Sequence, residues 1–288
     1  MPEVLQPSAD AALREWSARV RANREQVDQF REATPGDFYA PIAGMFRADP
    51  RRRDEPTLER LLALVQPDDV VLDIGAGGGR YALPLALASR EVIAIEPSAG
   101  MRQVLSAGMA EHGIRNISVV DGRWPADAVG IGGDLALISH IGYDVEDIGP
   151  FLDAMESAAR RQCMAVLLGQ APPTEADLLW PFVHGVERAA LPSLREFLVL
   201  LLARGRFFEV QLVDRTPQTY ADPDQALTWL RQQLWTAPGS ARDRRLEEVA
   251  RDRLQEREGR FALSWEPVPV GVVTWKPTSA LAAAPPSP

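Results

Sequence analysis

The sequence is poor in the two residue types that most often bind transition metals. It has one cysteine, Cys163, and three histidines among 288 residues. A single cysteine excludes a disulfide within the chain, and because Cys163 lies beside a predicted strand we expect a small buried apolar residue. The histidines are scattered, and nothing has the spacing of a metal site. We therefore expect no metal cofactor.

Long apolar runs are also missing, and none approaches the roughly 18 residues needed to cross a membrane. The first residues do not have the basic and apolar character of a signal segment, so we expect a cytoplasmic protein with no membrane partner. The hydrophobic content of 46% is enough for one sizeable core. A net charge of -9 disfavours phosphate-rich partners, so we expect no nucleic acid. The sequence leaves the oligomeric state open, with a homodimer as one alternative.

A glycine loop follows directly after a short apolar strand expected at residues 70–72. The chain then reads Asp-Ile-Gly-Ala-Gly-Gly-Gly-Arg from Asp73 to Arg80. Glycines let the backbone turn tightly and keep side chains away from a ligand. The dinucleotide pattern G-x-G-x-x-G needs a third glycine where this chain has Arg80. The loop therefore favours a nucleoside-like cofactor over a dinucleotide.

Three further predicted strands end in polar or glycine residues. Ligands of open α/β sheets bind at the carboxyl ends of the strands, so these residues are expected to meet at one site. The first acid, Glu96, lies about 20 residues beyond the first loop glycine, where a carboxylate can accept hydrogen bonds from both ribose hydroxyls. The strands are expected at 91–95, 116–120 and 134–138, followed by Glu96, by Asp121 and Gly122, and by Ser139 and His140.

The pattern Asp-x-Gly-x-Gly-x-Gly resembles motif I of the class I S-adenosylmethionine (SAM)-dependent methyltransferases. The resemblance spans roughly residues 56–275 and is strongest over 70–140. It implies SAM as the cofactor, with the carboxylate of Asp121 near the adenine amino group. The expected cofactor-binding residues are Asp73, Gly75, Ala76, Gly77, Glu96, Pro97, Met101, Asp121, Gly122, Ser139 and His140.

The alternation of helices and strands predicts an α/β fold with parallel strands. The resemblance implies a Rossmann-like, seven-stranded, mostly parallel sheet with helices on both faces and an antiparallel last strand. We divide the chain into an N-terminal helical cap or lid and a SAM-binding domain that carries a helical insertion before its last strand. A disordered tail rich in alanine and proline follows. The boundaries are 1–55, 56–276 with the insertion at about 222–257, and 277–288.

The resemblance implies direct in-line transfer of the SAM methyl group to a nucleophile. Such a reaction depends mainly on alignment, and a general base matters only when the acceptor must lose a proton. Two histidines are candidates for that role: His140 after the fourth strand, and His184 in the variable segment where family members often bind the acceptor. A structural role explains either residue at least as well. The apolar and aromatic covering segments favour O- or N-methylation of a small molecule.

Three other functions remain as alternatives. An aminopropyltransferase uses the same fold with decarboxylated SAM, but the distinctive acidic polyamine pocket expected of it is not found in the sequence. An NAD-dependent oxidoreductase uses a similar strand, loop and helix, although Arg80 disfavours it. A non-catalytic protein with a SAM-binding fold would keep the same cofactor loop, because the loop indicates binding rather than turnover. The chemical identity of the acceptor is not readable from these motifs.

Overall fold

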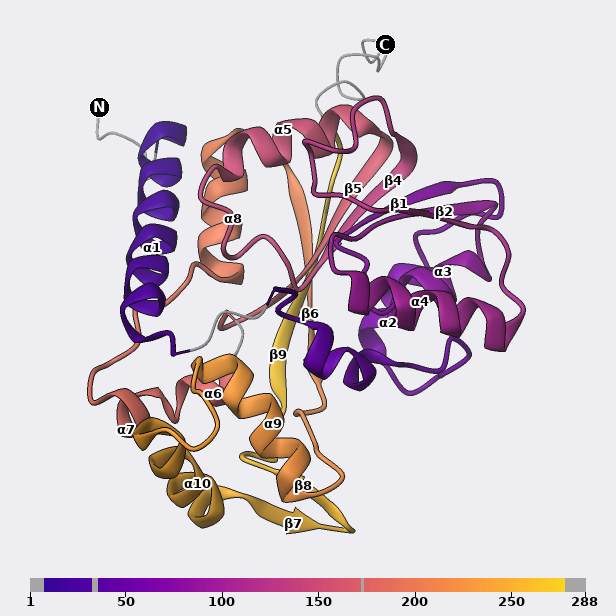
Figure 1. Cartoon of the computed structure of the whole chain (residues 1–288). Coiled ribbons are helices and arrows are strands. Elements are labelled where there is room, and N and C mark those ends of the chain that lie inside the picture. The colour runs from indigo at the N-terminus through magenta and orange to yellow at the C-terminus, as the bar shows by residue number, and fades with distance from the viewer. Residues whose placement is uncertain (1–7, 33–35, 172–173, 278–288) are drawn as a thin grey trace, which may run out of the picture.

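A seven-stranded sheet forms the centre of the protein (Figure 1). The computed structural model describes residues 8–32, 36–171 and 174–277. The strand order is β3-β2-β1-β4-β5-β9-β6, and β9 runs in the direction opposite to that of the other strands in this sheet. Its strands are β1 (Val70–Ile74), β2 (Glu91–Ile95), β3 (Ile117–Val120), β4 (Gly133–Ser139), β5 (Ala159–Leu168), β6 (Phe208–Arg215) and β9 (Val268–Trp275). The expected fold class is confirmed.

Helices cover both faces of the sheet because successive side chains of its inner strands point to opposite sides. On β1, Leu72 and Ile74 face one apolar cluster while Val71 faces the other. The first cluster lies under α1 (Ala9–Phe30), α5 (Ile148–Ala158) and α8 (Leu194–Ala203). The second lies under α2 (Pro56–Leu62), α3 (Ala82–Ala86) and α4 (Ala99–His112).

A third apolar cluster lies below the sheet as drawn in Figure 1. It is built around Trp180, Leu230 and Leu246, all of them fully buried. The helices that form it are α6 (Thr174–Asp177), α7 (Trp180–His184), α9 (Pro223–Leu234) and α10 (Ala241–Arg253). A small hairpin of β7 (Gln255–Arg257) and β8 (Arg260–Ala262) follows α10. The insertion between β6 and β9 therefore joins the segment after β5 to form one helical unit.

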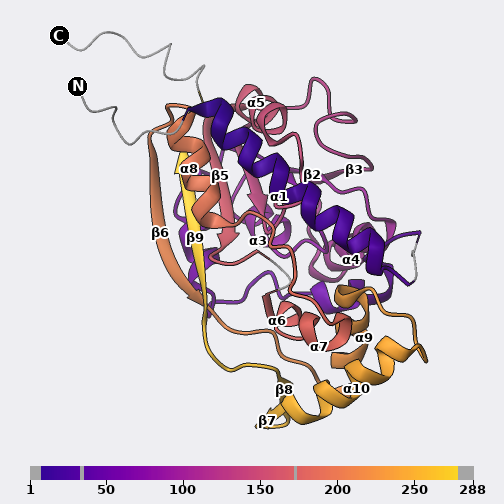
Figure 2. The same cartoon turned by 90° about the vertical axis from the view of Figure 1, so that its left-hand side faces the viewer.

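The N-terminal helix α1 belongs to two of these clusters at once. Trp16 and Val20 pack in the sheet core, whereas Val27 packs in the third cluster. Figure 2 shows α1 lying across the sheet layer and ending near the helices below it. Asn23, between the two apolar parts, is buried and donates to the carbonyl of Ala189 at 2.5 Å. This helix is therefore a brace between two parts of the protein, and the role of the N-terminal segment as a lid stays a prediction.

Local side-chain hydrogen bonds fix the start of two helices. Ser98 caps α4 by accepting from the Met101 N–H, and Ser193 and Glu196 form a capping box at the start of α8. Residues 260–262 do not join the central sheet, because they pair with β7 in a separate hairpin. The domain boundaries stay a prediction, and residues 278–288 of the expected tail lie outside the described residues. No helix within the described ranges is long and apolar enough to cross a membrane.

We expect Trp16→Ala to destabilise the protein strongly. The indole is 2% exposed, donates to the Val145 carbonyl at 2.9 Å and contacts the Phe197 ring edge-on. Truncating such a side chain should lower the free energy of unfolding by about 3 to 5 kcal/mol in urea titrations. The control is Arg14→Ala on the exposed side of the same helix, which should change it by no more than about 0.5 kcal/mol. Equal effects of the two variants would contradict the role of α1 as a brace.

Candidate functional site

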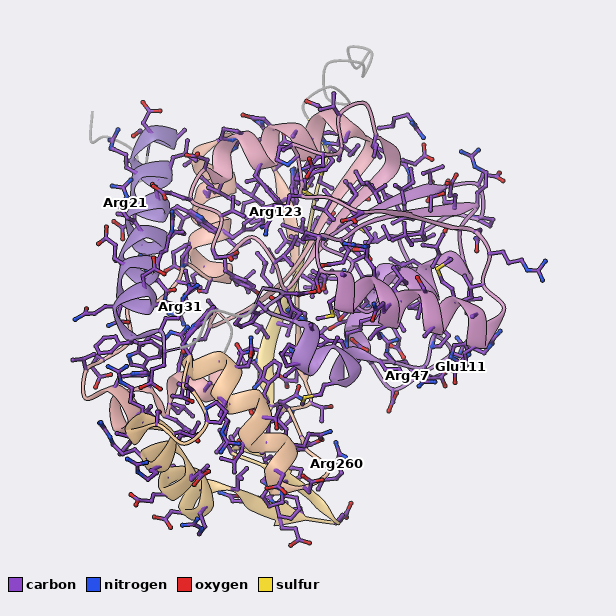
Figure 3. All side chains as sticks on the ribbon, viewed as in Figure 1. Arg21, Arg31, Arg47, Glu111, Arg123 and Arg260 are labelled. Carbon is purple, nitrogen blue, oxygen red and sulfur yellow. The ribbon has the colours of Figure 1, made fainter. Side chains whose placement is uncertain are left out.

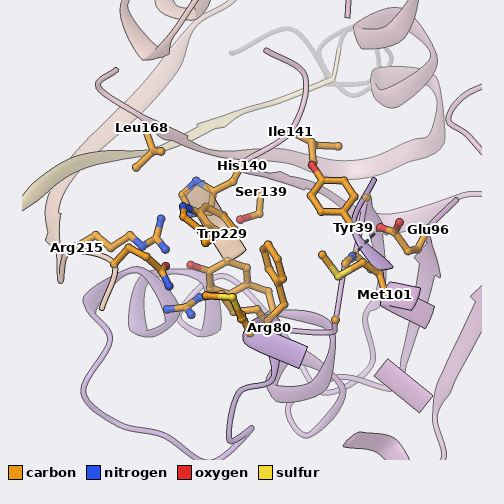
Figure 4. A pocket seen from close by; sticks show the side chains of 18 of the residues that line it. Tyr39, Arg80, Glu96, Met101, Ser139, His140, Ile141, Leu168, Arg215 and Trp229 are labelled. Atoms are coloured by element: carbon orange, nitrogen blue, oxygen red, sulfur yellow. Dashed lines mark hydrogen bonds between the residues drawn. The ribbon is translucent and has the colours of Figure 1, made fainter. Parts of the chain in front are cut away.

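A pocket lies at the carboxyl ends of the parallel strands and extends to β6 and β9 (Figure 4). One end is formed by the glycine loop after β1 and by the residues that follow β2 and β4. The other end is formed by residues at the ends of β5 and β6 and at the start of β9, with α9 above them. The lining includes Tyr39, Met45, Phe46, Asp73, Gly75, Ala76, Gly77, Gly78, Arg80, Glu96, Met101, Ser139, His140, Ile141, Leu168, Glu175, Arg215, Gln218, Trp229, Gln233 and Val268.

The glycine loop is held against the end of β2 by its own backbone. The N–H groups of Gly75 and Ala76 both donate to the Ile95 carbonyl, at 2.8 and 3.1 Å. Gly77 has a φ of 55°, and a Cβ added there would meet no atom within 4 Å. The space in front of Gly77 is therefore open to the pocket, and only glycine adopts this backbone without strain.

Glu96 joins the loop to the start of α4. Its side chain is 5% exposed, and it accepts hydrogen bonds from the Gly77 and Ser98 N–H groups, each at 2.8 Å. Burial raises the pKa of Glu96, while these two bonds act in the opposite direction. Each carboxylate oxygen keeps a further lone pair for a ligand.

A short segment after α1 covers the end of the pocket that the glycine loop forms, which is the expected cofactor end. It includes the 3-10 helix η1 (Ala40–Phe46), and Tyr39, Met45 and Phe46 line the pocket. Asp37 anchors the segment by accepting from Ser98 Oγ at 2.9 Å and from the Gly100 N–H at 3.0 Å. At its other end, Arg47 forms an ion pair with Glu111 of α4, and Figure 3 shows the two side chains together at the surface.

Asp73 is the acid that ends β1. It is 2% exposed, and burial, followed by the charge of Glu96, raises the pKa of Asp73 to about 7. The Ala82 N–H opposes this shift by donating to its carboxylate. Two acids, Asp73 and Glu96, therefore lie at the same end of the pocket, and a cationic ligand there favours their ionised forms.

His140 follows β4 and has a backbone φ of 55°. Its N–H donates to the Val166 carbonyl at 2.9 Å, but neither ring nitrogen, although buried, has a partner among the described residues. Burial, then the charges of Arg215 and Arg80, lowers the pKa of His140 well below its usual value. The ring is therefore neutral at pH 7 and is a weak base.

Glu175 faces the far end of the pocket, after β5. It is 9% exposed, and its Oε1 accepts from the Gln218 N–H at 3.0 Å while its buried Oε2 has no partner among the described residues. Burial raises the pKa of Glu175 to about 7, against the effects of the Gln218 bond and the Arg215 charge. A carboxyl group with this pKa exchanges protons readily near neutral pH.

The structure brings most of the expected cofactor residues together. Those that line the pocket are Asp73, Gly75, Ala76, Gly77, Glu96, Met101, Ser139 and His140. Pro97, Asp121 and Gly122 are not among the lining residues. The Asp121 side chain is 72% exposed and pairs with Arg102 at 2.7 Å. Its expected contact with a ligand stays a prediction.

His184 lies away from the pocket, in the third apolar cluster. The centre of its ring lies 4.0 Å from that of the Trp180 ring, and its Nε2 lies 2.9 Å from the Leu234 carbonyl oxygen. Burial lowers the pKa of His184 to about 4. The structure therefore gives it packing partners and no place in the pocket lining. Across the described residues, no group of three or more His, Cys, Asp or Glu side chains is arranged to hold a metal ion.

The pocket residues that escaped the sequence analysis as parts of a site include Glu175, Arg215 and Trp229. Each lies in a segment without a motif, and only the fold brings them to the pocket. The signal available for Arg215 was its place at the carboxyl end of a strand, which is where ligands of α/β sheets bind.

Comparisons with solved structures establish the fold. YcgJ of Bacillus subtilis is 17% identical with a TM-score of 0.52, covering 76% of this chain and 97% of that one. A candidate methyltransferase of Bacillus halodurans C-125 is 17% identical with a TM-score of 0.51, covering 78% and 99%. Coclaurine N-methyltransferase, bound to N-methylheliamine and S-adenosylhomocysteine (SAH), is 11% identical with a TM-score of 0.50, covering 94% and 96%. The chain has the class I methyltransferase fold, which confirms the resemblance seen in its motifs. No family model matches the chain.

One curated relative of the chain corrects an expectation about the partner. Over 94 residues it is 35% identical to 23S rRNA (uracil(1939)-C(5))-methyltransferase RlmD of Pseudomonas fluorescens (strain Pf0-1), a match that covers 32% of this chain and 19% of that enzyme. Because that relative acts on RNA, the expectation of a small-molecule acceptor and no nucleic acid is wrong. A net charge averages the whole surface and does not describe the local field where a partner binds.

We expect Gly77→Val to abolish binding of SAH while the fold is kept. The new side chain would fill the open space before the glycine loop. Isothermal titration with SAH measures the loss, and circular dichroism checks the fold. Gly113→Val is the matched control, since Gly113 also has a positive φ, of 67°, and open space around its Cβ but does not line the pocket. If both variants lose SAH, backbone strain and not ligand space explains the effect.

Proposed function

We propose that the protein transfers the methyl group of SAM to an oxygen or nitrogen of an acceptor bound at the β5 and β6 end of the pocket. One observation carries the proposal: a single pocket joins the glycine loop to buried polar atoms that have no protein partner. These atoms are Ser139 Oγ, both ring nitrogens of His140 and Glu175 Oε2, judged among the described residues. Buried polar groups without partners are rare, so these atoms indicate a polar ligand.

The cofactor end of the pocket fits a nucleoside with a positively charged tail. Gly77 leaves space for it, and Glu96 retains lone pairs suited to ribose hydroxyls. The Asp73 carboxylate favours the cationic sulfonium over a neutral thioether. When bound, SAM supplies a methyl carbon already activated by its positive sulfur, so the protein's part is to align the acceptor and exclude water.

The acceptor end supplies a base and a covering wall. Glu175 is positioned to take the proton that an O–H or N–H acceptor loses, and its raised pKa suits it to that role near neutral pH. His140 is a poorer base because its pKa is low, and we assign it to orienting the acceptor through its unpartnered nitrogens. Trp229 of α9 covers this end, and its ring centre lies 6.1 Å from that of Phe46 in the segment that covers the cofactor end. The thiol of Cys163 is fully buried in β5 and takes no part.

Titration of the purified protein tests cofactor binding. We expect SAM and SAH to bind at one site per chain and NAD to give no heat, because Arg80 stands where a dinucleotide site needs glycine. Heat with NAD alone would favour the oxidoreductase alternative. Binding of SAM without methyl transfer to any acceptor would favour a non-catalytic protein.

We expect kcat at saturating SAM to rise with pH through about 7 and then level off. Glu175, whose pKa is about 7, is protonated below that pH and accepts a proton only above it. Glu175→Gln should remove this dependence and lower kcat on the order of a hundredfold. His184→Gln, in the cluster away from the pocket, is the control and should keep the wild-type pH profile. An unchanged profile in Glu175→Gln would remove the residue from the reaction.

A further inference from the structure

Arg215 is a charged side chain in the pocket, and none of the described acidic residues forms an ion pair with it. It is the last residue of β6, at the acceptor end of the pocket, and is only partly exposed. Among the described residues its guanidinium makes no hydrogen bond or ion pair. Arginine has five donors in a rigid fork, and leaving them unpaired away from bulk water is unfavourable.

A second guanidinium lies nearby and makes the local charge more positive. Burial, and next the charge of Arg80, lowers the pKa of Arg215, which places the two groups within electrostatic reach. Both also lower the pKa of His140. Figure 4 shows Arg80 and Arg215 on the side of the pocket away from Glu96 and Met101. Two like charges around one space are stabilised when an anion lies between them.

The acids in this region do not neutralise the pair. The carboxylate of Glu55 is shared between two arginines and a tyrosine. Its Oε2 lies 2.5 Å from Arg52 Nε and 2.9 Å from Arg80 Nη2, and its Oε1 accepts from the Tyr81 hydroxyl at 2.7 Å. Glu175 is only partly ionised near pH 7 and has no ion pair with either arginine in the described part of the chain. The three guanidinium groups of Arg52, Arg80 and Arg215 are therefore balanced only by the ionised carboxylate of Glu55 and by the partly protonated carboxyl group of Glu175.

We infer that Arg80 and Arg215 bind an oxyanion, a carboxylate or a phosphate, carried by the methyl acceptor. This deepens the proposed function and rests on it, because it names the chemical class of the acceptor for the same pocket. Arg215 lies beyond β5 and β9 from the glycine loop, at the far end of the strand order. The anion is therefore assigned to the acceptor and not to the cofactor. Paired N–H donors in a plane match the two oxygens of such a group.

Binding of small probes to the SAH-saturated protein tests the inference. Benzoate, phenyl phosphate and benzamide all carry a phenyl ring, but the first two are anions and benzamide is neutral. NMR titration measures their weak binding. We expect benzoate or phenyl phosphate to bind about tenfold more tightly than benzamide, and Arg215→Gln to remove that preference. Tighter binding of benzoate would identify the acceptor's anionic group as a carboxylate, and tighter binding of phenyl phosphate would identify it as a phosphate. Equal binding of all three, or no binding of either anion, would overturn the inference.

The cofactor's own carboxylate is the competing source of an anion. SAH carries it, whereas 5′-methylthioadenosine does not. We expect Arg215→Gln to bind both compounds as the wild type does. Selective weakening of SAH would assign the arginine to the cofactor and overturn the inference.

Two further variants keep the test interpretable. Arg115→Gln removes an exposed arginine outside the pocket and should leave every affinity unchanged. Arg215→Lys keeps the charge without the planar fork and should retain part of the anion preference, including where Arg215→Gln fails to fold. Failure of the wild type to bind SAM or SAH would refute the proposed function, whereas the anion preference measured without SAH still tests the arginine pair.

Discussion

The buried carboxylate of Glu96 is the constraint on which the site depends. It accepts from the glycine loop at Gly77 and from the start of α4 at Ser98. Ser98 in turn donates to Asp37, which also accepts from Gly100 and so holds the segment that covers the cofactor end. One chain of hydrogen bonds thus joins β2, the loop, α4 and η1. Its centre is an acid whose pKa is raised by burial and lowered by the same two N–H donors, so the site's geometry and its electrostatics are set together.

The sheet and the cofactor end were predictable because their signals are local. Apolar runs, a glycine loop and polar strand ends lie within a few residues of each other, and backbone sterics turn them into the same structure in any context. The capping box at Ser193 and Glu196 is predictable for the same reason. The pairing of residues 260–262 is not predictable in this way, because apolar character alone does not say which sheet a strand joins.

The β5 and β6 end of the pocket was not predictable because it is made by tertiary contacts between segments without motifs. Trp229 comes from an insertion, Glu175 from a short helix after β5, and Arg215 from the end of β6. The role of α1 was hidden for a related reason. Its apolar stripe is the same whether it covers a ligand or a core, and only the partners of Trp16 and Val27 show that it braces two cores.

The charges of the pocket are arranged along its length, and this arrangement gives a ligand a direction. Asp73 and Glu96 make one end acidic, and Arg80 and Arg215 make the other basic, as Figure 4 shows for Glu96 and Arg215. A cation is favoured at the first end and an anion at the second, with neutral His140 between them. Burial is the main cause of the raised pKa values of Asp73 and Glu175, and neither carboxyl group forms an ion pair within the described part of the chain. Ligands of opposite charge at the two ends therefore relieve the unpaired charges that folding leaves in the pocket, and filling it stabilises the fold.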